Sequence, residues 1–251
     1  MFGISYLQAF LMIVNYTDNG WKIITQRSHG LLAGQICAQW KKTDQPARWF
    51  ETLIATTEHD DVYNEFEDSG LLTISGGPKN FVMTRFEKEY ASRLMTMALT
   101  KGRYIGLLVA RHMNFLYSAD PAGRRFCAEL KKQEPTWLKE AKASVQELDA
   151  SYRLLEFCDA FSLLICQGMV QPEQRRMEIS DGPDGKFYEL FSDESGALIV
   201  EGWPFEVPEF QISYESRLVE QLEFKSEAEF RKALRESPVV VNELTLRKRN
   251  Q

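Results

Sequence analysis

The first regular pattern along the chain is a pair of apolar, β-branched runs at residues 12–17 and 21–25, separated by Asp18, Asn19 and Gly20. Asn and Gly tolerate the positive φ angles of tight turns, so these runs predict a β-hairpin. A strand that begins at Met12 makes this residue a candidate start of the natural chain. The apolar first fourteen residues have no basic segment and no cleavage site, so we expect no targeting signal and a cytoplasmic protein.

Between residues 28 and 166, apolar side chains recur every three to four positions, which is typical of amphipathic helices. Ser28 is the expected N-cap of the first helix, and Gly102 separates the third helix from the fourth. The last helix would be about eight turns long, which is unusual in a globular protein and indicates a kink. The predicted helices cover residues 28–41, 48–60, 85–100, 104–117, 123–133 and 136–166.

From about residue 176, apolar and polar residues alternate. Ser226 and Glu229 form a capping-box pattern for a helix over 226–235. The predicted strands cover residues 186–191, 197–203, 211–219, 222–225 and 239–247. Because two strands alone are only marginally stable, we expect the C-terminal strands to recruit the N-terminal hairpin.

The expected fold class is α+β, with a mainly helical core flanked by a small, mostly antiparallel sheet. The hairpin occupies residues 1–27, the helical core residues 28–170 and the β-rich region residues 171–251, and together they form one compact unit. With 251 residues, of which 44% are hydrophobic, the chain can bury a substantial core.

Charge and cysteine content exclude several classes of protein. The net charge of −6 argues against a surface that binds a nucleic-acid duplex. The longest apolar run is too short to span a membrane. Cys37, Cys127, Cys158 and Cys166 lack the paired spacing of a metal site and predict reduced core thiols. A homodimer is compatible with all of these features.

Ionisable residues occupy core-facing positions in four predicted helices: His29, Asp60, His112 and Asp159. Each lies three, four or seven residues from apolar side chains on the same face, as Asp60 does from Leu53. Burying a lone carboxylate or imidazole costs several kcal/mol, roughly, unless it is paired or binds a metal. We therefore expect these residues to converge on one site.

His29, the adjacent pair His59-Asp60 and then Asp159 follow one another along the chain. This order resembles that of the HD superfamily of metal-dependent phosphohydrolases, in which a His, a His-Asp pair and a later Asp on separate helices hold a divalent metal. The resemblance covers residues 28–168. Within it, the segments TQRSHGLLAGQ, EHDD, ARHMNFL and CDAFSL are similar to an uncharacterised bacterial family of about this length.

The resemblance implies that His29, His59, Asp60 and Asp159 are the ligands of one divalent metal ion. Two imidazoles and two carboxylates suit Mn, Fe, Co, Ni, Zn or Mg, and they leave positions for water and substrate. The implied activity is hydrolysis of a small phosphate ester, either nucleotide-like or another phosphorylated metabolite, by a metal-activated water.

Five further residues near these ligands are candidates for catalysis or binding. Binuclear members of the superfamily have two more histidines before the last Asp, whereas this chain has only His112. We expect His112 to be a fifth ligand or the acid that protonates the leaving oxygen. Glu58 and Asp61 flank the pair and are candidates to orient the water, or are simply solvated. Arg111 and Arg153 are candidate phosphate contacts, or surface and ion-paired arginines.

Two other functions stay open. A non-catalytic metal- or ligand-binding module would have a complete coordination sphere or a closed pocket. An interaction protein would use the buried polar residues only as ion pairs, and a chelator would then change nothing.

Overall fold

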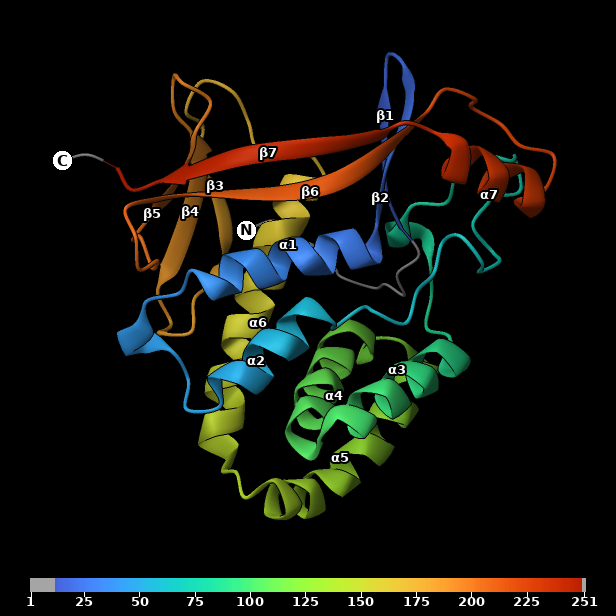
Figure 1. The fold of residues 1–251 in the computed structure, drawn as a ribbon. Coiled ribbons are helices and arrows are strands. Elements are labelled where there is room, and N and C mark those ends of the chain that lie inside the picture. Colours follow the sequence, from blue (N-terminus) through green and yellow to red (C-terminus); the bar gives the residue numbers. More distant parts are fainter. Residues whose placement is uncertain (1–11, 250–251) are drawn as a thin grey trace.

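A computed structural model describes residues 12–249, so the expectations for residues 1–11 lie outside it. Within this range, seven α-helices and seven strands form an α+β fold, which confirms the expected fold class. A curled sheet lies along one side of the molecule, six helices are gathered beneath it, and the last helix lies beside it (Figure 1).

The N-terminal hairpin forms as predicted and joins the C-terminal strands. Strands β1 (Met12–Thr17) and β2 (Gly20–Thr25) pair antiparallel, with Thr17 opposite Gly20. Gly20 has a φ of 118°, which an L side chain rarely adopts. Strand β2 then pairs with the end of β6 (Glu209–Val219), where Ile23 lies opposite Arg217. The two ends of the chain therefore build one sheet.

The sheet has the strand order β1-β2-β6-β7-β5-β4-β3. The remaining strands are β3 (Met177–Asp181), β4 (Phe187–Ser192), β5 (Leu198–Glu201) and β7 (Val239–Arg247). All neighbours pair antiparallel except β5 and β7, which are parallel. Strand β3 was not predicted; its sequence MEISD contains only two apolar residues. The predicted strand 222–225 is wrong, since this segment connects β6 to helix α7 (Glu227–Glu236) without strand pairing.

Six helices form the layer beneath the sheet. They are α1 (Gln26–Ala38), α2 (Trp49–Thr57), α3 (Lys88–Lys101), α4 (Arg103–Tyr117), α5 (Pro121–Ala141) and α6 (Val145–Cys166). Helix α1 lies against β6, and α2 packs among α1, α4 and α6. Helix α6 is buried over most of its surface, including Leu155, Phe157 and Phe161, as expected of a central helix.

The helix predicted over residues 136–166 is wrong at its start. Helix α5 continues through Pro135 to Ala141, and the chain then reverses at Lys142, whose φ is 50°. Helix α6 begins after Ser144, which forms a capping box with Glu147. The capping box at Ser144, and not Pro135, marks the start of this helix. A proline removes only one hydrogen bond from a helix, whereas a cap supplies partners for its free N–H groups.

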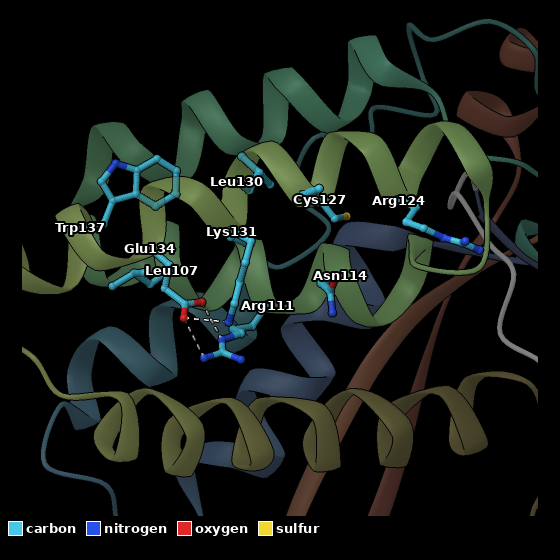
Figure 2. A pocket seen from close by; sticks show the side chains of 11 residues that line it. Leu107, Arg111, Asn114, Arg124, Cys127, Leu130, Lys131, Glu134 and Trp137 are labelled. Carbon is cyan, nitrogen blue, oxygen red and sulfur yellow. Dashed lines mark hydrogen bonds and ion pairs between the residues drawn. The ribbon is translucent and has the colours of Figure 1, made fainter.

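Helices α4 and α5 pack against each other and leave a pocket of about 290 Å³ between them (Figure 2). Arg111 and Glu134 form an ion pair in its wall. The four cysteines are free and buried, as predicted. No helix in the described part of the chain has both the length and the apolar composition that a membrane span needs.

Candidate metal centre

Close contact between α1 and α2 brings the first candidate ligands together. A Cβ atom on Gly30 would lie 2.5 Å from the carbonyl oxygen of Thr57, and one on Gly34 would lie 2.2 Å from Thr57 Oγ1. Only glycine at these two positions lets the helices approach so closely. His29 on α1 consequently lies opposite the turn that follows α2.

His59 and Asp60 belong to that turn and not to the helix. Helix α2 ends at Thr57, and Glu58 leaves the helical conformation with a φ of −115°. The expectation that Asp60 shares a helical face with Leu53 is therefore wrong. The turn still directs both side chains inward, since His59 is fully buried and Asp60 is 2% exposed.

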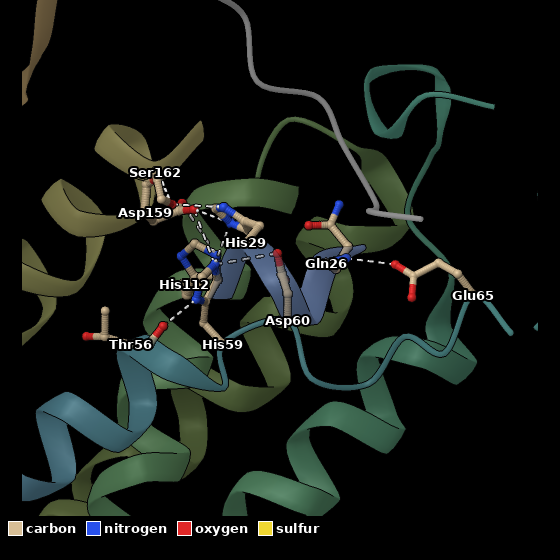
Figure 3. A network of polar contacts seen from close by, with 9 residues as sticks. All are labelled: Gln26, His29, Thr56, His59, Asp60, Glu65, His112, Asp159 and Ser162. Atoms are coloured by element: carbon tan, nitrogen blue, oxygen red, sulfur yellow. Dashed lines mark hydrogen bonds and ion pairs between the residues drawn. The ribbon is translucent and has the colours of Figure 1, made fainter. Parts of the chain in front are cut away.

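The four predicted metal ligands converge in one buried cluster (Figure 3). Asp159 Oδ1 on α6 lies 3.0 Å from His29 Nε2 and 3.2 Å from His59 Nε2. The two Nε2 atoms are 3.2 Å apart, and His59 Nε2 is 3.5 Å from Asp60 Oδ2. The buried groups His29, His59 and Asp159 could therefore hold a metal ion.

Hydrogen bonds at the opposite ring nitrogens orient two of the histidines. The Nδ1–H of His59 donates to the carbonyl oxygen of Thr56 at 2.7 Å. Ser162 Oγ donates its proton to the carbonyl oxygen of Asp159 at 2.9 Å, so it accepts from His29 Nδ1–H at 2.8 Å. Both Nε2 atoms then face the cluster, where each can bind a proton or a metal ion. Such contacts typically fix metal-binding histidines.

The cluster has the spacing and the chemistry of a cation site. Lone pairs and carboxylate oxygens at 3.0–3.5 Å repel one another unless a proton or a metal ion lies among them. Ligand atoms about 2.1 Å from a metal and at right angles to one another lie roughly 3 Å apart. Among the described residues, Asp60 Oδ2 and Asp159 Oδ1 also lack a hydrogen-bond partner. The residues present therefore fit a divalent metal ion.

The pKa values in the cluster show a strong preference for positive charge. Burial lowers the pKa of His59, but the carboxylates of Asp60 and Asp159 outweigh burial and raise this pKa to about 9. Burial raises the pKa of Asp159, yet the neighbouring His59 and His29 bring it well below its ordinary value. Without a metal, a proton on His59 supplies the positive charge. Metal binding would displace that proton.

His112 on α4 is the fifth buried residue of the cluster. Its Nε2 lies 4.0 Å from Asp159 Oδ2, and its ring packs edge-on against His59 with centroids 4.9 Å apart. Neither ring nitrogen has a hydrogen-bond partner within residues 12–249. Burial lowers the pKa of His112 to about 3, despite the nearby Asp159. A neutral imidazole with a free lone pair favours the fifth-ligand alternative over the acid.

Glu58 and Asp61, the predicted water-orienting carboxylates, pair with cations outside the cluster. Glu58 Oε2 lies 2.6 Å from Lys101 Nζ, and Asp61 Oδ1 lies 3.0 Å from Arg27 Nε. Both carboxylates are about one-third exposed. The structure therefore does not bring them together with the histidines.

Arg111 and Arg153, the predicted phosphate contacts, form no hydrogen bond or ion pair with the cluster residues in the described part of the chain. Arg111 Nε is 3.1 Å from Glu134 (Figure 2). Its Nη2 is 3.3 Å from Asp149. Arg153 is exposed on α6. These positions agree with the alternative of ion-paired and surface arginines.

Gln26 and Glu65 lie beside the cluster and were not predicted (Figure 3). Glu65 accepts a hydrogen bond from the backbone N–H of Gln26 at 2.7 Å, and burial raises the pKa of Glu65 to about 7. The Gln26 amide is buried, and neither its nitrogen nor its oxygen has a partner in the described range. Gln26 precedes His29 by three residues, so helical spacing could have placed it on the same face. Glu65 lies in an irregular loop, where no such spacing applies.

A family model described as "Protein of unknown function (DUF3891)" matches residues 12–221. The chain belongs to this family. The residues matched to DUF3891 include all five residues of the cluster and begin at strand β1. The DUF3891 description assigns no activity, so the link to the HD superfamily stays a prediction. No match was found among curated proteins or among solved structures.

Proposed function

We propose that the protein is a metal-dependent hydrolase of small phosphate esters. The observation that carries this proposal is the convergence of two Nε2 lone pairs and two carboxylates at 3.0–3.5 Å in a buried cluster. The order of these residues along the chain, which resembles that of the HD superfamily, supports the choice of reaction. Phosphorylated metabolites, including nucleotides, are the substrate class.

His29, His59, Asp60 and Asp159 would hold the ion, with His112 as a fifth ligand. A divalent metal supplies a water of lowered pKa and polarises a phosphoryl oxygen. Ser162 and the Thr56 carbonyl hold the imidazoles in the required tautomer. In the reaction, the water oxygen bonds to phosphorus, the ester P–O bond breaks, and the proton released by the water ends on the leaving oxygen. The surrounding core keeps bulk water away from these groups.

One observation favours a second candidate, a non-catalytic metal-binding module. The five residues are at most 4% exposed. If five protein ligands complete the coordination sphere of the metal, no position remains for water and substrate. This candidate predicts stoichiometric metal without turnover.

Elemental analysis of the purified protein is the decisive first experiment. The wild type should contain close to one divalent ion per chain, and a His59→Ala/Asp60→Ala double variant should contain only background metal. Asp149→Asn is the matched control, because Asp149 lies on α6 like Asp159 but pairs with Arg111. If neither protein takes up metal after incubation with Mn, Fe, Co, Ni or Zn, the cluster is a buried polar network and the interaction protein becomes the better account.

Hydrolysis is then measured with the loaded protein. p-Nitrophenyl phosphate and a panel of nucleoside monophosphates serve as substrates, and release of phosphate is the readout. The hydrolase predicts turnover that a chelator stops and that Asp149→Asn retains. Full metal occupancy with no phosphate released from any ester would select the non-catalytic module.

A further inference from the structure

Tyr152 on α6 has a hydroxyl group that the fold leaves without a partner. The oxygen is buried, and no donor or acceptor within residues 12–249 bonds to it. Tyr152 precedes Asp159 by seven residues, which places the two side chains on the same face of the helix. An O–H group that loses water without gaining an acceptor destabilises the folded protein. Such a group needs an explanation.

The ring of Tyr152 forms part of the wall around the metal centre. It packs against His112 with ring centroids 6.3 Å apart, and His112 Nε2 in turn lies 4.0 Å from Asp159 Oδ2. Phe115 stacks on His112 with centroids 6.4 Å apart and is 41% exposed. Tyr152 itself is partly exposed. These two rings therefore connect the buried His112 with the surface of the protein.

The chemistry of the hydroxyl suits an anionic ligand. A tyrosine hydroxyl is protonated at neutral pH and can donate one hydrogen bond. The group therefore remains a neutral O–H donor. Phosphoryl oxygens carry negative charge and accept hydrogen bonds strongly. A donor placed where charge develops in the transition state increases the rate of reaction.

We propose that Tyr152 is a catalytic residue whose hydroxyl donates a hydrogen bond to a phosphoryl oxygen of the ester at the metal centre. This inference rests on the proposed function. The hydroxyl does not exchange its proton during the reaction; it stabilises the charge that accumulates on that oxygen while the bond to the leaving oxygen breaks.

Tyr104 provides a matched control within the same helical core. Its hydroxyl donates to the carbonyl oxygen of Glu147 at 2.9 Å and also lies 2.8 Å from Ser151 Oγ. Tyr104→Phe and Tyr152→Phe each remove one hydroxyl oxygen from a tyrosine of the helical core. The first change breaks hydrogen bonds within the protein, whereas the second removes a hydroxyl that has none in the described chain.

The test compares the two variants with the wild type, each loaded with metal. Orthophosphate affinity is measured by calorimetry, stability by thermal unfolding, and activity with p-nitrophenyl phosphate. Tyr152→Phe should keep its metal, should unfold at the same or a higher temperature, and should bind orthophosphate about tenfold more weakly. Its kcat should fall about 10²-fold, as expected for the loss of one transition-state donor. Tyr104→Phe should unfold at a lower temperature with unchanged phosphate affinity.

Two results would overturn the inference. One is equal orthophosphate affinity in the wild type and Tyr152→Phe, or no binding by either. The other is a fall in unfolding temperature for Tyr152→Phe as large as that for Tyr104→Phe, because the hydroxyl would then have a partner within the protein. A loaded protein that binds phosphate but hydrolyses no ester would refute the hydrolase instead, and the phosphate affinity of Tyr152→Phe would still decide the role of the hydroxyl.

Discussion

Two polar networks lie in different halves of this molecule. In the sheet, Lys22 Nζ on β2 donates to Asn242 Oδ1 on β7 at 2.8 Å and to the Tyr214 hydroxyl on β6 at 3.1 Å. The Asn242 amide nitrogen in turn donates to Ser216 Oγ at 2.9 Å. In each of these contacts a donor meets an acceptor. The network therefore joins β2, β6 and β7 through contacts between protein groups.

The helical cluster is arranged in the opposite way. The Nε2 atoms of His29 and His59 face each other and the Asp159 carboxylate, so a proton or a metal ion has to lie among them. Buried polar groups are normally paired within the fold, because unpaired groups are costly. A buried network that the protein leaves incomplete indicates a missing cation, whereas the half-buried contacts of the sheet indicate only structure.

The largest effect expected from this difference is on removal of metal. A divalent ion at about a thousand times its Kd would stabilise the fold by about 4 kcal/mol. This corresponds to a rise in the midpoint of thermal unfolding of roughly 10 °C for a chain of this size. Asp159→Asn should abolish the rise, and Asp149→Asn should keep it. Equal unfolding midpoints for the wild type with metal and with a chelator would show that the cluster, like the sheet network, binds no metal.

A pH effect of similar size is expected from Glu65. Burial raises the pKa of Glu65 from 4.5 to about 7 in the folded protein. The folded state therefore holds this proton more tightly than the unfolded state. Its contribution to stability is complete below pH 4.5 and is lost as the pH rises to about 7. The loss is roughly 3 kcal/mol, at about 1.4 kcal/mol for each pH unit.

Glu65→Gln should remove this loss, because the amide oxygen can still accept from the Gln26 N–H. Relative to the wild type, the variant should gain about 3 kcal/mol in free energy of unfolding between pH 4.5 and pH 8. Urea unfolding at several pH values measures the gain. Glu129→Gln changes an exposed residue and is the control; its free energy of unfolding should vary with pH as that of the wild type does. The same pH dependence for Glu65→Gln would contradict the prediction.

A smaller effect is expected from Ser162→Ala. This change removes the acceptor of His29 Nδ1–H while keeping every ligand. Losing such a partner typically weakens metal affinity by about 10–100-fold, or about 1.4–2.7 kcal/mol. Competition with a fluorescent chelator measures the Kd. Ser151→Ala, on the same helix but bonded to Tyr104, should leave it unchanged. An equal loss in both variants would mean that the helix and not the hydrogen bond controls affinity.

The smallest effect belongs to the sheet network. Asn242→Ala removes an acceptor of Lys22 and a donor to Ser216 and should lower the free energy of unfolding by about 1 kcal/mol. Metal content should stay that of the wild type, because β7 contributes no ligand. A variant that loses metal along with stability would show that the two networks are coupled.

Much of the fold was predictable because local signals agreed with tertiary structure. The hairpin was predicted from two β-branched runs and a turn at Asp18-Asn19. The two runs lie within a few residues of each other in the chain. The inward orientation of His29 on α1 and Asp159 on α6 followed from helical periodicity, since both lie on apolar faces. These predictions depend on spacing within one element.

Other features depend on packing between distant segments, and periodicity cannot show them. His59 and Asp60 point inward because a turn after α2 directs them, although a helical face was expected. Likewise, nothing in the sequence shows that the amide of Gln26 and the hydroxyl of Tyr152 lack partners, because this depends on what packs around them. Residues that the fold leaves unsatisfied are therefore the ones that only a structure reveals.

The pairing of β2 with β6 has a consequence for how the protein is made. Ile23 meets Arg217, which a ribosome adds about 190 residues later. At about 5–20 residues per second, the hairpin has to wait roughly 10–40 s for its neighbour. All five residues of the cluster have been added by residue 159, well before β6 emerges. We expect the nascent chain to gather its histidines first, and chaperones to meet it mainly through the exposed edge of the waiting hairpin.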